Sequence, residues 1–178
     1  GIPKTIDNDI QYVSSSFGYA TALQQAEGVI RAAHVEAKGA PNGIGLVKLM
    51  GRDAGFIAAG AALASTEANF VLVPEVPFPL EGSGGFLEAV EQRIRRRGHA
   101  VIVVAEGAGQ HLFEGIDLGR DASGNRRYGD IGVFLRDRLN QHFAQIGLEL
   151  NLKYFDPSYL IRSVPANSRD RILSDQFA

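Results

Sequence analysis

The sequence predicts a layered α/β protein with a mostly parallel, Rossmann-like sheet, and two observations support this fold class. Four short apolar runs have the length of strands and are mostly rich in β-branched or aromatic residues, as buried parallel strands are. Longer segments with helical spacing separate these runs, and strands that alternate with helices are typical of α/β layers. The predicted strands are 44–50, 70–73, 100–105 and 150–155, and the predicted helices are 17–38, 55–68, 85–97 and 130–145.

Composition limits the class of protein. The 178 residues are 45% hydrophobic, which is enough for one substantial core. A net charge of -2 gives no general attraction to nucleic acid or anionic membranes, and the lack of cysteine excludes disulfides and thiolate metal sites. There is neither a membrane-length apolar run nor a signal-peptide pattern, so the cytoplasm is the expected location. Because the chain opens on Gly1-Ile2-Pro3 and closes in an unstopped helical segment at 170–178, we expect a fragment truncated at both ends.

Polar residues and glycines follow three of the predicted strands. They are Met50-Gly51-Arg52-Asp53, Pro74-Glu75 and Glu106-Gly107-Ala108-Gly109-Gln110. Ligands of open parallel sheets bind outside the carboxyl ends of the strands, so these segments predict one crevice. Residues 111–129 are rich in turn formers and predict a surface loop or small hairpin without chemistry.

The segment Thr5-Ile6-Asp7-Asn8-Asp9 carries two carboxylates two residues apart. In an extended backbone Asp7 and Asp9 face the same side, where one could accept a proton and the other interact with a metal ion or orient the base. Lys4 and Thr5 could hold phosphate oxygens. The alternative is an Asx-rich turn that leads into the first helix, and the spacing does not decide between them.

The residues at the strand ends also have two interpretations. Gly51 lets the backbone approach a ligand closely, and Arg52 could stabilise charge on a transferred phosphoryl group, or could simply pair with Asp53. Glu106 could accept hydrogen bonds from sugar hydroxyls, or it could cap the following helix or pair with a lysine. Glu75, which lies between prolines, is the more structural of the two glutamates.

A third group lies near the turn at Asp156-Pro157, in what we take for a turned strand. Lys153, Tyr159 and Arg162 could clamp a phosphate monoester. The alternative places Tyr159 in the core and leaves the cations solvated. The basic run at 93–97 is better explained as a solvated helix face.

Five of these motifs stand in the order and approximate spacing that 6-phosphofructokinases have, so the chain resembles that family over essentially its whole length. The form resembles the plant, trypanosome and related bacterial branch. The resemblance implies the phosphofructokinase fold, with 1–178 as a partial phosphofructokinase domain. The motifs lie at 1–10, 48–52, 74–78, 105–110 and 153–162.

The resemblance also implies roles for these residues. Asp7 would accept the proton of the 1-hydroxyl of fructose 6-phosphate, and Arg52 would stabilise the transition state. Lys4 and Thr5 would lie near the transferred phosphoryl group. Asp9 would support the Mg²⁺ environment, whose main ligand is expected upstream of Gly1. The implied sugar-phosphate site comprises Thr5, Ile6, Asp7, Met50, Gly51, Arg52, Glu106, Lys153, Tyr159, Leu160, Ile161 and Arg162.

The implied activity is that of a glycolytic kinase, a transferase that makes fructose 1,6-bisphosphate with ATP as the expected donor. Pyrophosphate is the close alternative, since Lys4 occurs in enzymes of both kinds, and a non-catalytic sugar-phosphate-binding subunit is the second. The family's Gly-Gly-Asp loop would precede Gly1, so residues 1–178 alone are expected to be inactive. Family members form dimers or tetramers. Lys153 and Tyr159 stand where the short bacterial enzymes have arginine and histidine, so effector control of their type is not expected.

Overall fold

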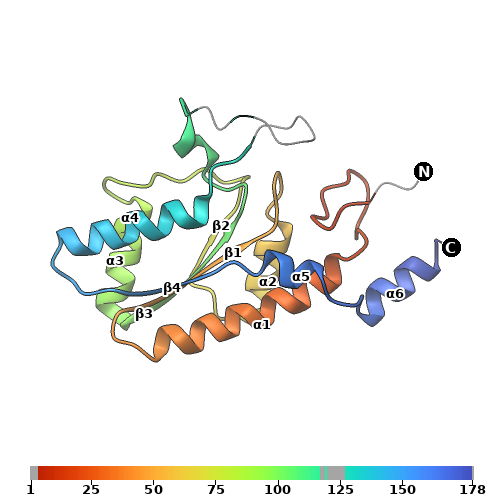
Figure 1. Cartoon of the computed structure of the whole chain (residues 1–178), viewed down its shortest axis with the longest axis horizontal. Helices are drawn as coiled ribbons and strands as arrows, with labels where there is room; N and C mark the ends of the chain where they lie inside the picture. The colour runs from red at the N-terminus through yellow and green to blue at the C-terminus, as the bar shows by residue number, and fades with distance from the viewer. Residues whose placement is uncertain (1–3, 117–118, 120–126, 178) are drawn as a thin grey trace.

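The computed structural model describes residues 4–116, 119 and 127–177 (Figure 1). Four strands alternate with helices along the chain, as the apolar runs and the helical spacing predict. The elements are α1 (Tyr19–Lys38), β1 (Gly43–Leu49), α2 (Phe56–Ser65), β2 (Phe70–Leu72), α3 (Phe86–Arg97), β3 (His99–Ala105), a short 3-10 helix η1 (Gln110–Phe113), α4 (Ile131–Gln145), β4 (Asn151–Phe155), α5 (Ser158–Arg162) and α6 (Ser168–Asp175).

The four strands form one sheet in the order β2-β3-β1-β4, and every strand pair among the described residues is parallel. Parallel neighbours need crossover connections, and the helices supply them. Leu49 at the end of β1 lies opposite Ala105 at the end of β3, and Val47 lies opposite Phe155 at the end of β4. The carboxyl ends of the three strands therefore meet at one edge of the sheet. The predicted α/β fold class is confirmed.

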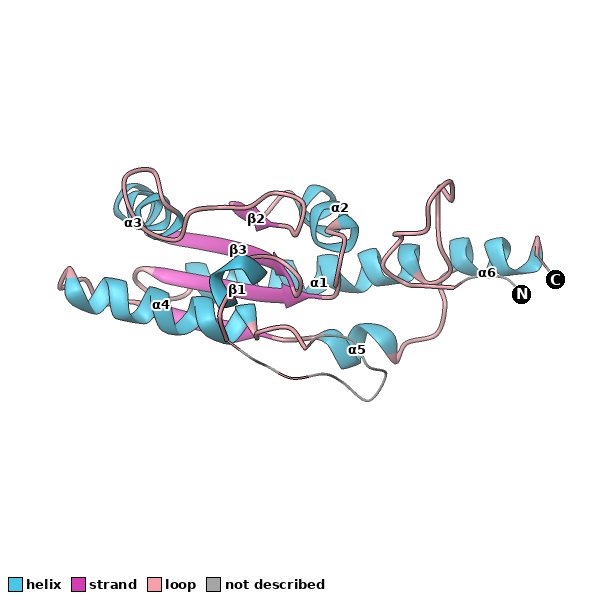
Figure 2. Cartoon of the chain, turned by 90° about the horizontal axis from the view of Figure 1, so that it is seen from above, coloured by secondary structure: helices cyan, strands magenta, loops and turns pink. Residues whose placement is uncertain are grey.

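Helices cover both faces of the sheet (Figure 2). Ile44 and Leu46 of β1 pack with α3 and α4, whereas Val47 and Leu49 pack with α1 and α2. This alternation follows the two-residue period of a strand, and burial on both faces explains why β1 and β3 are almost continuously apolar. Among the described residues, no helix combines the length and apolarity needed to cross a bilayer.

The beginning of α1 is capped by a residue far away in the sequence. Asp170 of α6 accepts hydrogen bonds from the backbone N–H of Gly18 at 3.1 Å and from the N–H and hydroxyl of Thr21 at 2.7 and 2.5 Å. Its carboxylate is 2% exposed and satisfies donors that the first turn of a helix leaves open. Asp170 thus fastens α6 to α1. Part of the helix predicted at 170–178 is confirmed: α6 begins at Ser168, where Asn167 caps it, and it ends at Asp175.

Replacing Asp170 by alanine is expected to lower the free energy of unfolding by about 3 kcal/mol, since hydrogen bonds to a charged acceptor are lost and buried donors stay unpaired. Chemical denaturation measures the change. Asp175→Ala is the matched control, because Asp175 is exposed on the same helix. Equal stability of the two variants would show that this cap does not hold α6.

Candidate active site

The segments that follow β1 and β3 are bound to each other. The N–H of Glu106 donates to the carbonyl of Leu49 at 2.9 Å, and the N–H of Gly107 donates to the carbonyl of Gly51 at 3.0 Å. Gly51 has φ +128°, a conformation that only glycine adopts easily. Buried Met50 joins this turn to the core. Arg52 and Glu106 are therefore presented together at the strand ends, as predicted.

Gly107 lies so close to the carbonyl of Arg52 that a β-carbon would collide with it. We expect Gly107→Ala to lower the free energy of unfolding by about 1–3 kcal/mol, because the backbone of the Gly51-Arg52 turn must shift. Gly28→Ala is the control. Gly28 is exposed within α1 with open space around it, so that change should stabilise by up to about 1 kcal/mol. Thermal unfolding compares them, and a neutral Gly107→Ala would contradict the tight contact.

The amino-terminal segment brings Asp7 to the same place. The backbone N–H of Arg52 is hydrogen-bonded to the Asp7 carboxylate, which is half-buried. Burial raises the pKa of Asp7, that N–H lowers it in part, and the charges of Asp9 and Asp53 raise it again, so the pKa lies above its ordinary value. A half-buried carboxylate of this kind is a suitable proton acceptor.

Of the two backbone conformations considered for Asp7 and Asp9, the extended one is wrong. Asn8 between them has φ +62°, so the strand-like alternation of side chains is broken. Its side chain accepts a hydrogen bond from the N–H of Ser16 at 2.7 Å, and Thr5 Oγ1 accepts one from the N–H of Asp7 at 3.1 Å. Local hydrogen bonds of this type favour turns over strands. The segment is therefore a turn, and this turn delivers Asp7 to the strand ends.

Glu106 shares its surroundings with Asp7. Burial raises the pKa of Glu106 and the charge of Asp7 raises it further, while Lys48, Arg162 and Arg52 oppose this shift. Two carboxylates and three cations therefore act on one another at the ends of β1 and β3. Such a mixed cluster can hold a polar anionic ligand, with the cations on the anion and the carboxylates on hydroxyl groups.

The chain after β4 forms a short helix, so the strand predicted to turn at Asp156-Pro157 ends there. Proline fits the start of a helix, and Ser158 donates to Asp156 Oδ1 at 2.7 Å through its hydroxyl. Because Tyr159 and Arg162 are three residues apart on α5, they share one face, with the guanidinium carbon 4.9 Å from the ring centre.

The residues of α5 differ in their exposure to solvent. Tyr159 is 78% exposed, so the alternative that placed it in the core is wrong. Leu160 is also exposed, whereas Ile161 is buried against the α1 side of the sheet. Lys4 and Ile6 line a cleft of about 260 Å³ together with Arg162. The amino-terminal segment and α5 thus meet beside the strand ends.

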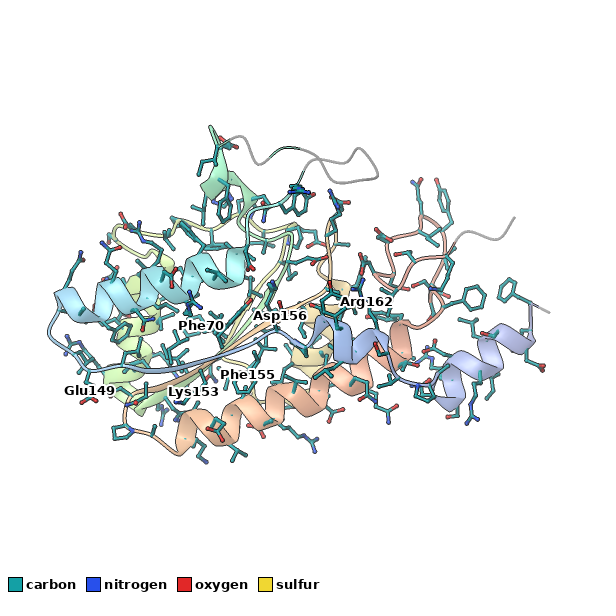
Figure 3. All side chains as sticks on the ribbon, viewed as in Figure 1. Phe70, Glu149, Lys153, Phe155, Asp156 and Arg162 are labelled. Carbon is teal, nitrogen blue, oxygen red and sulfur yellow. The ribbon has the colours of Figure 1, made fainter. Side chains whose placement is uncertain are left out.

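Lys153 is not brought to this cluster. It lies within β4 opposite Gly45, and its exposed side chain borders a groove between β4 and α1. Figure 3 shows Lys153 partway along the strand, with Asp156 and Arg162 farther toward α5. A distance of two residues from the strand end is enough to separate its side chain from the others.

Two interactions at the site escaped the sequence analysis. Lys48, with a side chain only 12% exposed, pairs with Asp156 at 2.9 Å and with Asp130 at 3.2 Å. Burial lowers the pKa of Lys48, but the hydrogen bonds to Asp156 and Asp130 outweigh it and raise the pKa above its ordinary value. A lysine within an apolar strand was the available signal for this network.

The second interaction joins Tyr128 to the turn after β1. The phenol donates to Asp53 Oδ1 at 2.6 Å, and the Arg52 guanidinium carbon lies 4.7 Å from the ring centre. The hydrogen bond to Asp53 therefore holds the Tyr128 ring next to the Arg52 guanidinium. No local sequence signal places Tyr128 here, because Tyr128 and Asp53 are 75 positions apart in the sequence.

The structural role expected for Glu75 is confirmed. Its carboxylate accepts a hydrogen bond at 2.8 Å from the N–H of Gly55, the residue that caps α2. In the basic run at 93–97, Arg95, Arg96 and Arg97 are exposed. In the turn-rich stretch expected at 111–129, residues 117–118 and 120–126 lie outside the described residues, and 111–113 belong to η1.

The fold and these side chains define an α/β protein whose candidate ligand site lies at the carboxyl ends of parallel strands, where ligands usually bind in this class. Among the described residues, no group of three or more acidic, histidine or cysteine side chains is arranged to hold a metal ion. The profile of the family described as Phosphofructokinase matches residues 1–178. The chain therefore belongs to the phosphofructokinase family, as its motifs predict.

Curated relatives come from both bacteria and plants. The ATP-dependent 6-phosphofructokinase of Borreliella burgdorferi is 49% identical over 97% of this chain and 40% of that protein. ATP-dependent 6-phosphofructokinase 1 of Arabidopsis thaliana is 53% identical over 97% of this chain and 37% of that protein. The chain thus spans about two fifths of the length of these relatives. The crystal structure of a pyrophosphate-dependent phosphofructokinase from Marinobacter aquaeolei superimposes with a TM-score of 0.71 at 26% identity, over 98% of this chain and 41% of that one.

Proposed function

We propose that the complete natural polypeptide containing this chain transfers the γ-phosphoryl group of ATP to the 1-hydroxyl of fructose 6-phosphate, a step of glycolysis. The observation that carries the proposal is the half-buried Asp7 carboxylate, bound by the backbone N–H of Arg52 at the strand ends. Family membership and the names of the relatives support the same reaction.

In this reaction Asp7 accepts the proton of the 1-hydroxyl as the new P–O bond forms, and its raised pKa favours that transfer. Arg52 faces the charge that develops on the transferred phosphoryl group, and Lys4 and Thr5 hold its oxygens. The backbone at Ile6, Met50 and Gly51 lines the sugar.

The other end of the sugar phosphate is held by the remaining groups. Glu106 accepts hydrogen bonds from sugar hydroxyls, since its carboxylate oxygens lie at the strand ends beside Arg52. Arg162 and Tyr159 of α5 bind the 6-phosphate end, with Leu160 and Ile161 in the same turn. Lys153 borders the groove beside β4, so it contacts the 6-phosphate only if the ligand extends into that groove.

A cation would offset the repulsion among the acidic groups around Asp7, although the described residues by themselves form no metal site. Asp9 and Asp53 both act on Asp7 by repulsion, and Mg²⁺ commonly binds one or two carboxylates together with substrate phosphates. Mg²⁺, when bound here, neutralises charge on the donor phosphates. Exposed Asp9 is the side chain in this chain that would support it. We also propose a homo-oligomer, dimer or tetramer, in the cytoplasm.

The test is product formation by the purified complete polypeptide with fructose 6-phosphate, Mg²⁺ and either ATP or pyrophosphate. The expected result is fructose 1,6-bisphosphate with ATP and little with pyrophosphate. Product formed with pyrophosphate but not with ATP would show that pyrophosphate is the donor. The structural similarity to the Marinobacter enzyme favours this second candidate. Binding of the sugar phosphate without product from either donor would show a non-catalytic subunit instead.

A further inference from the structure

Arg52 is a long side chain, and long cations normally lose considerable rotamer entropy when they are fixed in one place. Here the guanidinium lies over the face of Tyr128, 4.7 Å from its centre. An arginine this close to an aromatic face is held by cation–π attraction. The ring therefore restricts the directions that Arg52 can take.

Tyr128 is itself held in place. Its hydroxyl donates to Asp53 Oδ1 at 2.6 Å, directly after Arg52 in the chain. On its other side, the Gly129 N–H donates to Gln110 Oε1 at 3.0 Å, and Gln110 Nε2 donates to the carbonyls of Gly129 and Glu106 at 3.1 and 3.2 Å. The ring is thus tied to the loops after both β1 and β3.

The next residue along the chain extends these anchors. Asp130 caps α4 by accepting from the N–H of Val133 at 3.1 Å, and it pairs with Lys48 of β1. Tyr128 lines a cleft of about 320 Å³ with Lys48, Arg52 and Glu106. Its ring therefore forms part of the cleft wall, where it can affect a ligand through Arg52.

We propose that Tyr128 is a positioning residue, which holds the Arg52 guanidinium over the cleft in the orientation that phosphoryl transfer requires. This inference rests on the proposed function and deepens it. Preorganised charge stabilises a transition state without rearranging during the reaction, so a loosened Arg52 costs turnover more than substrate binding.

The experiment measures kcat and KM for fructose 6-phosphate in the complete polypeptide, with ATP and Mg²⁺. Tyr128→Leu removes the ring and is expected to lower kcat about tenfold, with KM changed less than about twofold. Tyr128→Phe keeps the ring and should lose less than about threefold in kcat. Recovery by phenylalanine distinguishes the stacking from the hydrogen bond.

The decisive measurement repeats Tyr128→Leu in an Arg52→Ala background. If Tyr128 acts through Arg52, the second substitution adds almost nothing, because the group that it orients is gone. A further tenfold loss in that background, or an unchanged kcat for Tyr128→Leu alone, overturns the inference while the proposed function stands. A wild-type protein that forms no product overturns both.

A folding defect is checked by thermal unfolding of every variant. If Tyr128→Leu does not fold, Tyr128→Met takes its place, since methionine fills much of the same space without the ring. This variant is expected to lower kcat about tenfold, and only when Arg52 is present. An equal effect without Arg52 overturns the inference.

Discussion

An Asp7→Asn enzyme is expected to turn over about a thousandfold more slowly than the wild type, since it lacks the group that accepts the hydroxyl proton. KM for fructose 6-phosphate should change far less, because asparagine keeps the shape of the side chain and can still meet the N–H of Arg52. Steady-state kinetics of the complete polypeptide measures both. Asp137→Asn is the matched control, because Asp137 is exposed on α4 and pairs with Arg136.

The pH dependence tests the same group. A base works only when it is deprotonated, so kcat/KM should fall as the pH falls through the pKa of Asp7, which burial raises above its ordinary value. The residual rate of Asp7→Asn should lack this acid limb. A variant that keeps a tenth or more of wild-type turnover, or the same limb, would remove Asp7 from the role of base.

Arg52→Ala is the second large effect, with an expected loss in kcat of about one hundredfold to one thousandfold. The side chain is removed while the backbone N–H that binds Asp7 stays, so the base keeps its partner. Arg52→Lys should recover only part of the rate, because lysine lacks the planar guanidinium that stacks on Tyr128.

The control for Arg52 is Arg95→Ala, because Arg95 is an exposed arginine that pairs with Glu91 on α3. It should leave both kinetic constants unchanged. The informative contrast is between kcat and KM. If Arg52→Ala raised KM and left kcat intact, Arg52 would bind substrate and transition state equally, and its proposed role at the developing charge would be wrong.

The sheet could be predicted because burial on both faces leaves strands such as β1 and β3 almost purely apolar. The four longest of the described helices could be predicted because their sequences have helical spacing. The short helix α5 could not. Its five residues give too little periodicity, and Asp156-Pro157 is as typical of a turn as of a helix start. The cap from Asp170 to α1 joins residues 149 or more positions apart, so no local pattern contains it.

The candidate site also has parts that could be predicted from the sequence and parts that could not. Arg52 and Glu106 could be placed together because the carboxyl ends of parallel strands share one edge. The position of Asp7 depends on the turn at Asn8, which has φ +62° and whose side chain binds the N–H of Ser16, eight residues away. Tyr128 contacts Arg52 although the two residues lie far apart in the sequence, so no local pattern contains this contact.

The most direct measurement is a crystal structure of the complete polypeptide with fructose 6-phosphate. We expect the 1-hydroxyl oxygen to lie about 2.6–3.2 Å from a carboxylate oxygen of Asp7, which is the reach of a general base. The 6-phosphate should lie toward Arg162 on α5. A sugar phosphate whose 1-hydroxyl points away from Asp7, beyond a hydrogen bond or one bridging water, would contradict the assignment of Asp7 as the base.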